Sequence, residues 1–177
     1  MVYVLIADGF EEAEALLPVD ILRRSGIEVN TVGIKSKIQV GAHSIPIICD
    51  IEINEIDITD IEMIILPGGA GHKNLDESEK VHNLIDYCVE NNIYIASICA
   101  APSILGKKNL LKGKKAVCYP GFSDFLYGAK ISEDKTATDG IFITGKGPGA
   151  AAEFGFEIVS ILKDKETSDK TKEMMLY

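Results

Sequence analysis

The chain has 177 residues, close to the length of one ordinary domain. Apolar residues make up 46% and charged residues 25%, which excludes a disordered, collagen-like or low-complexity protein. The formal net charge of −9 argues against nucleic acid or an anionic membrane surface as a partner. We therefore expect one domain over residues 1–177, with no nucleic-acid and no membrane partner.

The N-terminal segment predicts a strand, not a targeting signal. It has no basic region and reaches an acid at Asp8, and no apolar run in the chain approaches the length of a membrane span. The four cysteines (Cys49, Cys88, Cys99 and Cys118) form no CxxC pair and lie at no zinc-finger spacing from a histidine. We expect a cytoplasmic protein with reduced thiols, no metal and no cofactor, in which one cysteine at most is reactive.

Short apolar runs alternate with helical patterns along the chain, as in βαβ units. The predicted elements in chain order are a strand at 2–7, a helix at 11–24, a strand at 28–34, one or two edge strands at 40–50, a strand at 63–66, a helix at 75–90, a strand at 93–98, a helix at 100–108, a short strand at 115–118, an irregular segment at 119–139 with a strand at 129–131, a strand at 141–144 and a helix at 150–162. The charged tail at 163–177 predicts a short solvated helix or a frayed end. The whole predicts an α/β, flavodoxin-like fold, with a mostly parallel sheet and helices on both faces.

Functional residues in such sheets gather beyond the carboxyl ends of the strands. Cys99 lies at one such end, between a strand and a helix, with Ser97, Ala100 and Ala101 as small neighbours. This pattern predicts a nucleophile elbow with sulfur in place of oxygen, and the following helix is expected to lower the pKa of the thiol. The alternative is an ordinary buried cysteine.

Two other strand ends carry candidate residues. Gly68 and Gly69 follow a buried strand, where glycine lets a backbone N–H approach a reacting oxygen, although a plain turn is the alternative. Glu14 lies in the first turn of the first helix, beside the apolar face, so that its carboxyl could serve as acid or base. An acid that only stabilises the helix dipole is the alternative there.

Taken together, four motifs resemble the DJ-1/PfpI superfamily, of the class I glutamine-amidotransferase-like fold, and its DJ-1 branch in particular. They are Ala-Asp-Gly-Phe-Glu-Glu-Ala-Glu with Pro-Val-Asp-Ile-Leu-Arg-Arg, then Leu-Pro-Gly-Gly, Ser-Ile-Cys-Ala-Ala-Pro and Thr-Gly-Lys-Gly-Pro-Gly. The resemblance implies Cys99 as nucleophile, Glu14 as a protonated carboxyl at its sulfur, and Gly69 and Ala100 as oxyanion N–H donors. It also implies site-supporting roles for Asp20 and Arg24.

Histidines depart from the family pattern. The protease-like branch has histidine directly after the cysteine, where this chain has Ala100, and Tyr119 occupies the position of another site histidine of the DJ-1 branch. Of the three histidines only His72 could approach the site, with a surface loop as the alternative. A Cys-His-acid triad is therefore not evident.

The resemblance implies a cofactor-free enzyme acting on dicarbonyls or their adducts, of glyoxalase or deglycase type. The alternative is a redox sensor or redox-regulated chaperone oxidised at Cys99, and a cysteine peptidase or other hydrolase ranks below both. A homodimer is expected because the first helix carries apolar residues on more than one side, among them Leu16 and Leu17.

Overall fold

The computed structural model describes all residues 1–177, and its centre is a seven-stranded sheet with the order β10-β11-β7-β6-β1-β2-β5. All neighbouring strands of this sheet pair in parallel except β10 and β11. The strands are β1 (Val2–Ile6), β2 (Val29–Gly33), β5 (Ile51–Glu52), β6 (Met63–Leu66), β7 (Tyr94–Ile98), β10 (Thr136–Asp139) and β11 (Phe142–Gly145). The prediction of a mostly parallel α/β sheet is confirmed.

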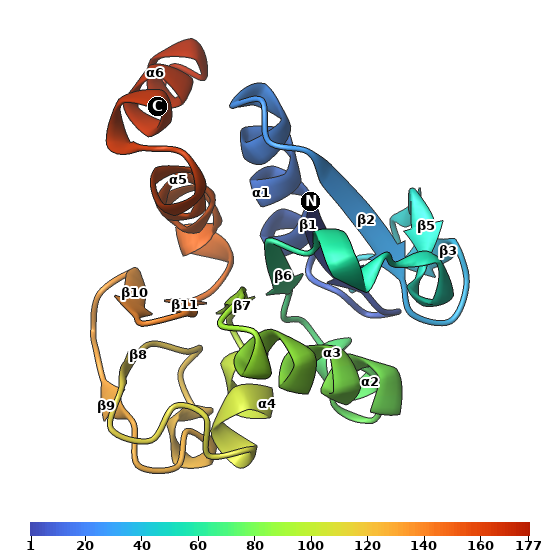
Figure 1. Cartoon of the computed structure of the whole chain (residues 1–177), viewed down its shortest axis with the longest axis vertical. Coiled ribbons are helices and arrows are strands. Elements are labelled where there is room, and N and C mark those ends of the chain that lie inside the picture. The colour runs from blue at the N-terminus through green and yellow to red at the C-terminus, as the bar shows by residue number, and fades with distance from the viewer.

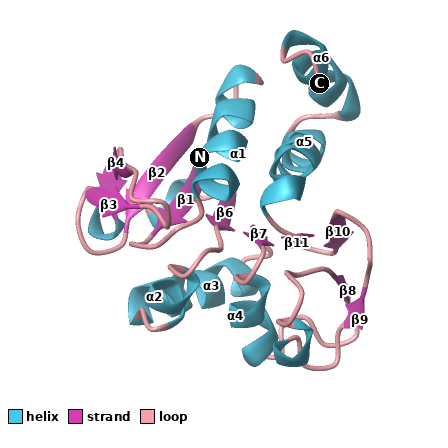
Figure 2. Cartoon of the chain, turned by 180° about the vertical axis from the view of Figure 1, so that it is seen from behind, coloured by secondary structure: helices cyan, strands magenta, loops and turns pink.

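Helices cover both faces of the sheet (Figures 1 and 2). They are α1 (Glu12–Arg24), α2 (His72–Asp76), α3 (Glu79–Glu90), α4 (Pro102–Lys107), α5 (Ala151–Leu162) and α6 (Lys165–Met174). In Figure 1, α1 and α5 lie on one side of the sheet, and α2, α3 and α4 lie on the other.

The two faces follow from the alternation of side chains along buried strands. On β1, Val2, Val4 and Ile6 join the core cluster under α1 and α5, while Tyr3 and Leu5 join the cluster under α3 and α4. No helix of the chain is both long and apolar enough to cross a membrane.

Two small two-stranded sheets accompany the main sheet, one an antiparallel hairpin and the other a parallel pair. β3 (Ile38–Val40) pairs antiparallel with β4 (Pro46–Ile48), as the predicted edge strands at 40–50 suggested, but in a sheet of their own. The N–H of Gly9 donates to Val40 O and the N–H of Ala42 to Phe10 O, so this hairpin is fixed to the loop after β1. β8 (Lys115–Ala116) pairs with β9 (Lys130–Ile131).

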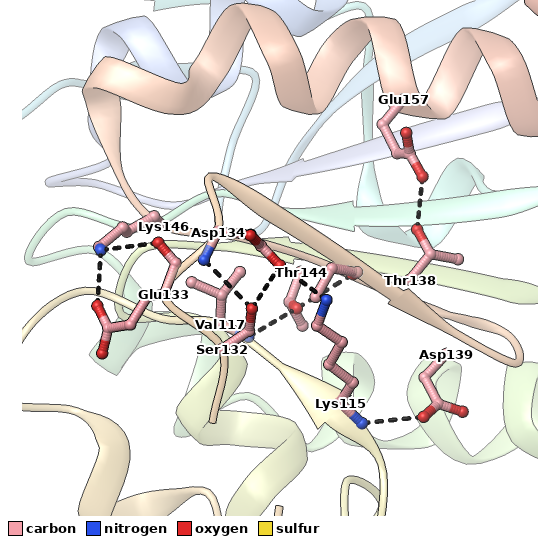
Figure 3. Close-up of polar contacts among 11 residues, drawn as sticks. Lys115, Val117, Ser132, Glu133, Asp134, Thr138, Asp139, Thr144, Lys146 and Glu157 are labelled. Carbon is pink, nitrogen blue, oxygen red and sulfur yellow. Dashed lines mark hydrogen bonds and ion pairs between the residues drawn. The ribbon is translucent and has the colours of Figure 1, made fainter. Parts of the chain in front are cut away.

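The largest difference from the sequence-based expectation is β10, within a segment expected to be irregular. Its sequence Thr-Ala-Thr-Asp buries only Ala137, so it carries no clear apolar pattern. Tertiary hydrogen bonds hold it instead (Figure 3): the buried Thr144 hydroxyl accepts from Val117 N–H and donates to Ala137 O, and Lys115 N–H donates to Asp139.

One further segment differs from the expected helix, and in another the structure decides between two expected alternatives. The helix predicted at 75–90 is two helices, because Ser78 accepts from Val81 N–H and thereby starts α3 anew. The tail at 163–177 forms α6, and its Ser168 hydroxyl donates to Phe156 O at 2.8 Å, so the tail folds onto α5 and does not fray. The other predicted elements agree closely with the observed ones.

Candidate active site

The segments that follow β1, β6 and β7 meet at one edge of the sheet. These three strands are adjacent and parallel, so their carboxyl ends lie side by side. The site is assembled there from the loop and helix after β1, the Pro-Gly-Gly turn after β6, and the turn after β7.

Cys99 forms a sharp turn directly after β7. Its φ of +66° lies in the left-handed region that residues other than glycine seldom adopt. The turn is held from both sides, since Cys99 N–H donates to Gly145 O at 2.9 Å and its carbonyl accepts from Tyr119 N–H at 2.8 Å. This geometry is the nucleophile elbow that the sequence predicts.

Glu14 reaches the elbow from the first turns of α1 and is fully buried. Its Oε2 accepts a hydrogen bond from Gly68 N–H at 2.9 Å, whereas Oε1 is buried without a hydrogen-bond partner. The carboxyl and the Cys99 thiol interact closely enough to shift the pKa of each other. One carboxyl oxygen is thus occupied by the backbone, and the other remains available for a proton.

The close approach of these groups depends on the absence of a side chain at Gly68. A Cβ there would lie 2.6 Å from Cys99 Cβ and 2.6 Å from Glu14 Oε2, which real contacts do not tolerate. Gly69 has a φ of +76°, and a Cβ on it would strike the backbone of Gly9 and Glu11. Both glycines are therefore required by the packing of three chain segments, which the sequence pattern alone leaves open.

The backbone N–H groups of Gly69 and Ala100 lie near the Cys99 sulfur and act to lower the pKa of its thiol. Two backbone donors that converge on a nucleophile can also hold an oxyanion that forms on the atom under attack. The structure brings together Cys99, Glu14, Gly69 and Ala100, and Gly68 binds the acid.

The sequence predicts a lowered pKa for the Cys99 thiol, but in the structure this pKa is raised. Burial raises the pKa of Cys99 to about 12, and the charge and the hydrogen bond of Glu14 add to this increase. The helix after the elbow, α4, has only six residues, so its dipole does not compensate. Burial also raises the pKa of Glu14, to about 7, and the nearby charge of Glu11 adds to it. Glu14 therefore keeps its proton up to near-neutral pH.

The supporting residues expected from sequence lie in two places. Asp20 and Arg24 form an exposed ion pair with each other at 2.8 Å, one helical turn apart, and contact neither Cys99 nor Glu14 in this chain. Tyr119 is bound to the elbow through its backbone N–H, and its half-exposed ring packs against Gly147.

His72 is buried and is not a surface loop residue. Its Nδ1 lies 2.8 Å from Gly69 O and its ring packs edge-on against Phe122, with ring centroids 5.2 Å apart. It contacts the Gly68-Gly69 turn after β6, called the oxyanion turn below, and not the sulfur. His43 pairs with Glu12 on the surface, and His82 binds Asp76 O, so no histidine forms a dyad with Cys99.

Comparison with known proteins agrees with this architecture. The DJ-1/PfpI family model matches residues 1–161. The chain is 35% identical to dj-1beta of Drosophila melanogaster, over 92% of this chain and 89% of that protein. It is 33% identical to the Parkinson disease protein 7 homolog of Danio rerio, over 96% and 93%. It is 32% identical to DJ-1 homolog A of Arabidopsis thaliana but spans only 46% of that protein.

Solved structures with the same fold include two DJ-1 proteins. Drosophila melanogaster DJ-1beta superposes with a TM-score of 0.93 at 32% identity, covering 99% of this chain and 96% of that one. Oxidized Toxoplasma gondii DJ-1 gives a TM-score of 0.94 at 29% identity, covering 99% and 97%. Sequence, fold and site geometry together lead to one assignment: the chain belongs to the DJ-1/PfpI family.

Proposed function

We propose that this protein is a cofactor-independent cysteine enzyme that converts reactive dicarbonyls, or their adducts with amines, into hydroxy acids. The observation that carries the proposal is the buried pair of Glu14 and Cys99, with the backbone N–H groups of Gly69 and Ala100 beside the sulfur. A relative from Pyrococcus abyssi, 27% identical over 92% of this chain, is named a deglycase, which supports the same reaction class.

The first step uses Glu14 as a base. Its carboxylate takes the thiol proton as Sγ of Cys99 adds to the aldehyde carbon of methylglyoxal, and the aldehyde oxygen becomes an oxyanion held by the Gly69 and Ala100 N–H groups. A pKa of about 7 suits Glu14 to accept and return a proton near neutral pH. The thiol therefore need not be ionised before the substrate arrives.

The same carboxyl completes the conversion. Glu14 returns its proton to the oxyanion, which gives a hemithioacetal. It then removes the proton from the former aldehyde carbon and delivers it to the adjacent carbon, while the hydroxyl proton passes to the neighbouring ketone oxygen, which leaves a lactoyl thioester on Cys99. Water then cleaves the thioester to lactate and free thiol, so methylglyoxal and one water give lactate and one proton. With an amine adduct, the S–C bond forms as the C–N bond breaks, and the amine takes the proton from Glu14.

The test is lactate formation from methylglyoxal by wild type, Cys99→Ser and Cys118→Ser. Cys118 is as buried as Cys99 but lacks the acid and the N–H donors, so it is the matched control. We expect turnover by wild type and Cys118→Ser, and none by Cys99→Ser. Equal turnover by all three proteins would refute the assignment of the nucleophile.

The second candidate function is a redox sensor, or a chaperone regulated by oxidation at Cys99. The unpartnered Oε1 of Glu14 favours it, because a protonated carboxyl could donate to a sulfinate on Cys99. Absence of methylglyoxal turnover combined with selective addition of two oxygens at Cys99 by peroxide would favour the sensor. A peptidase remains the weakest candidate, because no histidine contacts the sulfur.

We also propose that two copies of the chain pair through the β3–β4 hairpin and α1. Ile38 and Ile48 on the hairpin are 60% and 78% exposed, which is costly for large apolar side chains in water. Leu16 and Leu17 on α1 are only partly buried. A second copy would cover this apolar surface.

A further inference from the structure

A pocket of about 330 Å³ lies beside the oxyanion turn, next to the candidate active site. Its walls come from α2, from α4 and from the loop after Tyr119, which contributes Phe122. It exceeds the needs of a three-carbon dicarbonyl, and neither Cys99 nor Glu14 lines it. The chemistry proposed above therefore leaves this pocket without a role.

Each wall of the pocket is hydrogen-bonded to a residue of the active site. His72 Nδ1 binds Gly69 O at 2.8 Å, and the buried Ser103 hydroxyl donates to Ala100 O at 2.6 Å. Phe122 N–H donates to Tyr119 O at 3.1 Å, and Tyr119 N–H donates to the carbonyl of the nucleophile at 2.8 Å. The pocket thus adjoins both oxyanion donors and the elbow.

The charges around the pocket are of both signs, and two of them are unpaired. Lys107 is paired with Asp76 at 2.5 Å, so these two neutralise each other. Lys73 and Glu77 also line the pocket, both are exposed, and neither makes an ion pair or a side-chain hydrogen bond. Lys73 lies in α2 and Glu77 directly follows its last residue, four positions on, so a free cation and a free anion line the same cavity.

We propose that this pocket binds the α-carboxylate and α-ammonium groups of a free amino acid, with Lys73 facing the carboxylate and Glu77 the ammonium. The inference rests on the proposed function: the amino acid is one whose side-chain nitrogen carries the dicarbonyl adduct that Cys99 attacks. Phe122 offers an apolar wall to the aliphatic part of that side chain. A residue inside a peptide has neither terminal charge, so the pocket selects free amino-acid adducts over protein-bound ones.

Binding is tested with the unreactive part of the substrate. L-arginine is titrated into the ¹⁵N-labelled wild-type protein, and Nα-acetyl-L-arginine N-methylamide, which lacks both terminal charges, is the matched probe. We expect L-arginine to shift the amide resonances of His72, Ser103 and Phe122 with saturation, and the capped probe to leave them in place. No shift with L-arginine, or equal shifts with both probes, would overturn the proposal.

A charge-neutral double variant tests the two assigned residues. Lys73→Gln combined with Glu77→Gln keeps the net charge and the hydrogen-bonding capacity, and Lys80→Gln combined with Glu79→Gln is the control on the neighbouring helix outside the pocket. We expect the first pair to weaken L-arginine binding about 5-fold or more, as for loss of two exposed charge contacts, and the control to leave it unchanged. Equal binding by both pairs would contradict the assignment.

Turnover separates the failure of this proposal from failure of the function itself. With the first pair, the ratio of turnover of the L-arginine adduct to that of methylglyoxal should fall about 5-fold or more. Absence of methylglyoxal turnover by wild type would refute the enzyme while the L-arginine shifts could persist. Methylglyoxal turnover without those shifts would refute the amino-acid pocket alone.

Discussion

Replacing Glu14 by Gln removes the one buried carboxyl of the site while keeping its size and a hydrogen-bond donor. In the folded protein, burial raises the pKa of Glu14 from 4.5 to about 7, and the side chain is fully buried, so solvent screens it little. The unfolded chain therefore ionises this group at lower pH than the folded protein. Wild type loses stability as pH rises from about 4.5 to about 7, and the Glu14→Gln variant cannot show this loss.

The size of the effect follows from the interval between the two pKa values. That interval corresponds to about 3 kcal/mol, because each pKa unit is worth about 1.4 kcal/mol. The contribution of Glu14 to stability is fully present below pH 4.5 and is lost as pH rises through about 7. Relative to wild type, Glu14→Gln should gain about 3 kcal/mol in the free energy of unfolding between pH 4 and pH 8.

Urea unfolding of both proteins over this pH range measures the effect, and the difference between them cancels all other titrating groups. A difference that is flat with pH would refute the raised pKa, and with it the reasoning that Glu14 shuttles a proton. In the same variant, dicarbonyl turnover should fall on the order of 10²-fold or more, because Gln cannot exchange the proton. Turnover equal to wild type would reduce Glu14 to an acid that only begins a helix.

The remaining predictions concern the thiol, the glycine and the surface. Burial raises the pKa of both Cys99 and the equally buried Cys118, but only Cys99 has Glu14 beside it to take the proton as the sulfur attacks. Iodoacetamide at neutral pH should therefore label Cys99 before Cys118, and equal rates by peptide mass would argue against base assistance by Glu14. Gly68→Ala should abolish turnover, because its Cβ would strike Cys99 and Glu14, whereas Gly149→Ala, with nothing within 4 Å, should be active in the same assay. Light scattering at micromolar concentration should give the mass of a dimer, and Ile48→Lys should give that of a monomer; a monomeric wild type would contradict the pairing.

Much of the fold could be predicted from local patterns. The strand at the N-terminus is apolar at nearly every position because both of its faces are covered, and such a run is recognisable in any parallel sheet. β10 could not be predicted, because its pairing depends on the Thr144 hydroxyl and on the adjacent strand, neither of which leaves a pattern in its own residues.

The candidate active site was likewise predictable only in part. Cys99 is recognisable from its own neighbours, since small residues at the junction of a strand and a helix permit the elbow. The sequence also marks Glu14 and the Gly68-Gly69 turn as candidate site residues, but it does not show whether they contact the Cys99 thiol. Their convergence depends on the adjacency of three parallel strands, which no local pattern contains.

The sequence by itself thus determined the type of sheet, the candidate nucleophile and the residues able to surround it. Only the tertiary structure decided the direction of the thiol pKa, because burial in the folded core outweighs the short helix that the sequence places after Cys99. It also decided that His72 is buried against the oxyanion turn, a role that depends on Phe122 from a distant loop. Residue types and spacing follow from the chain, but desolvation and contacts between distant segments arise only when it folds.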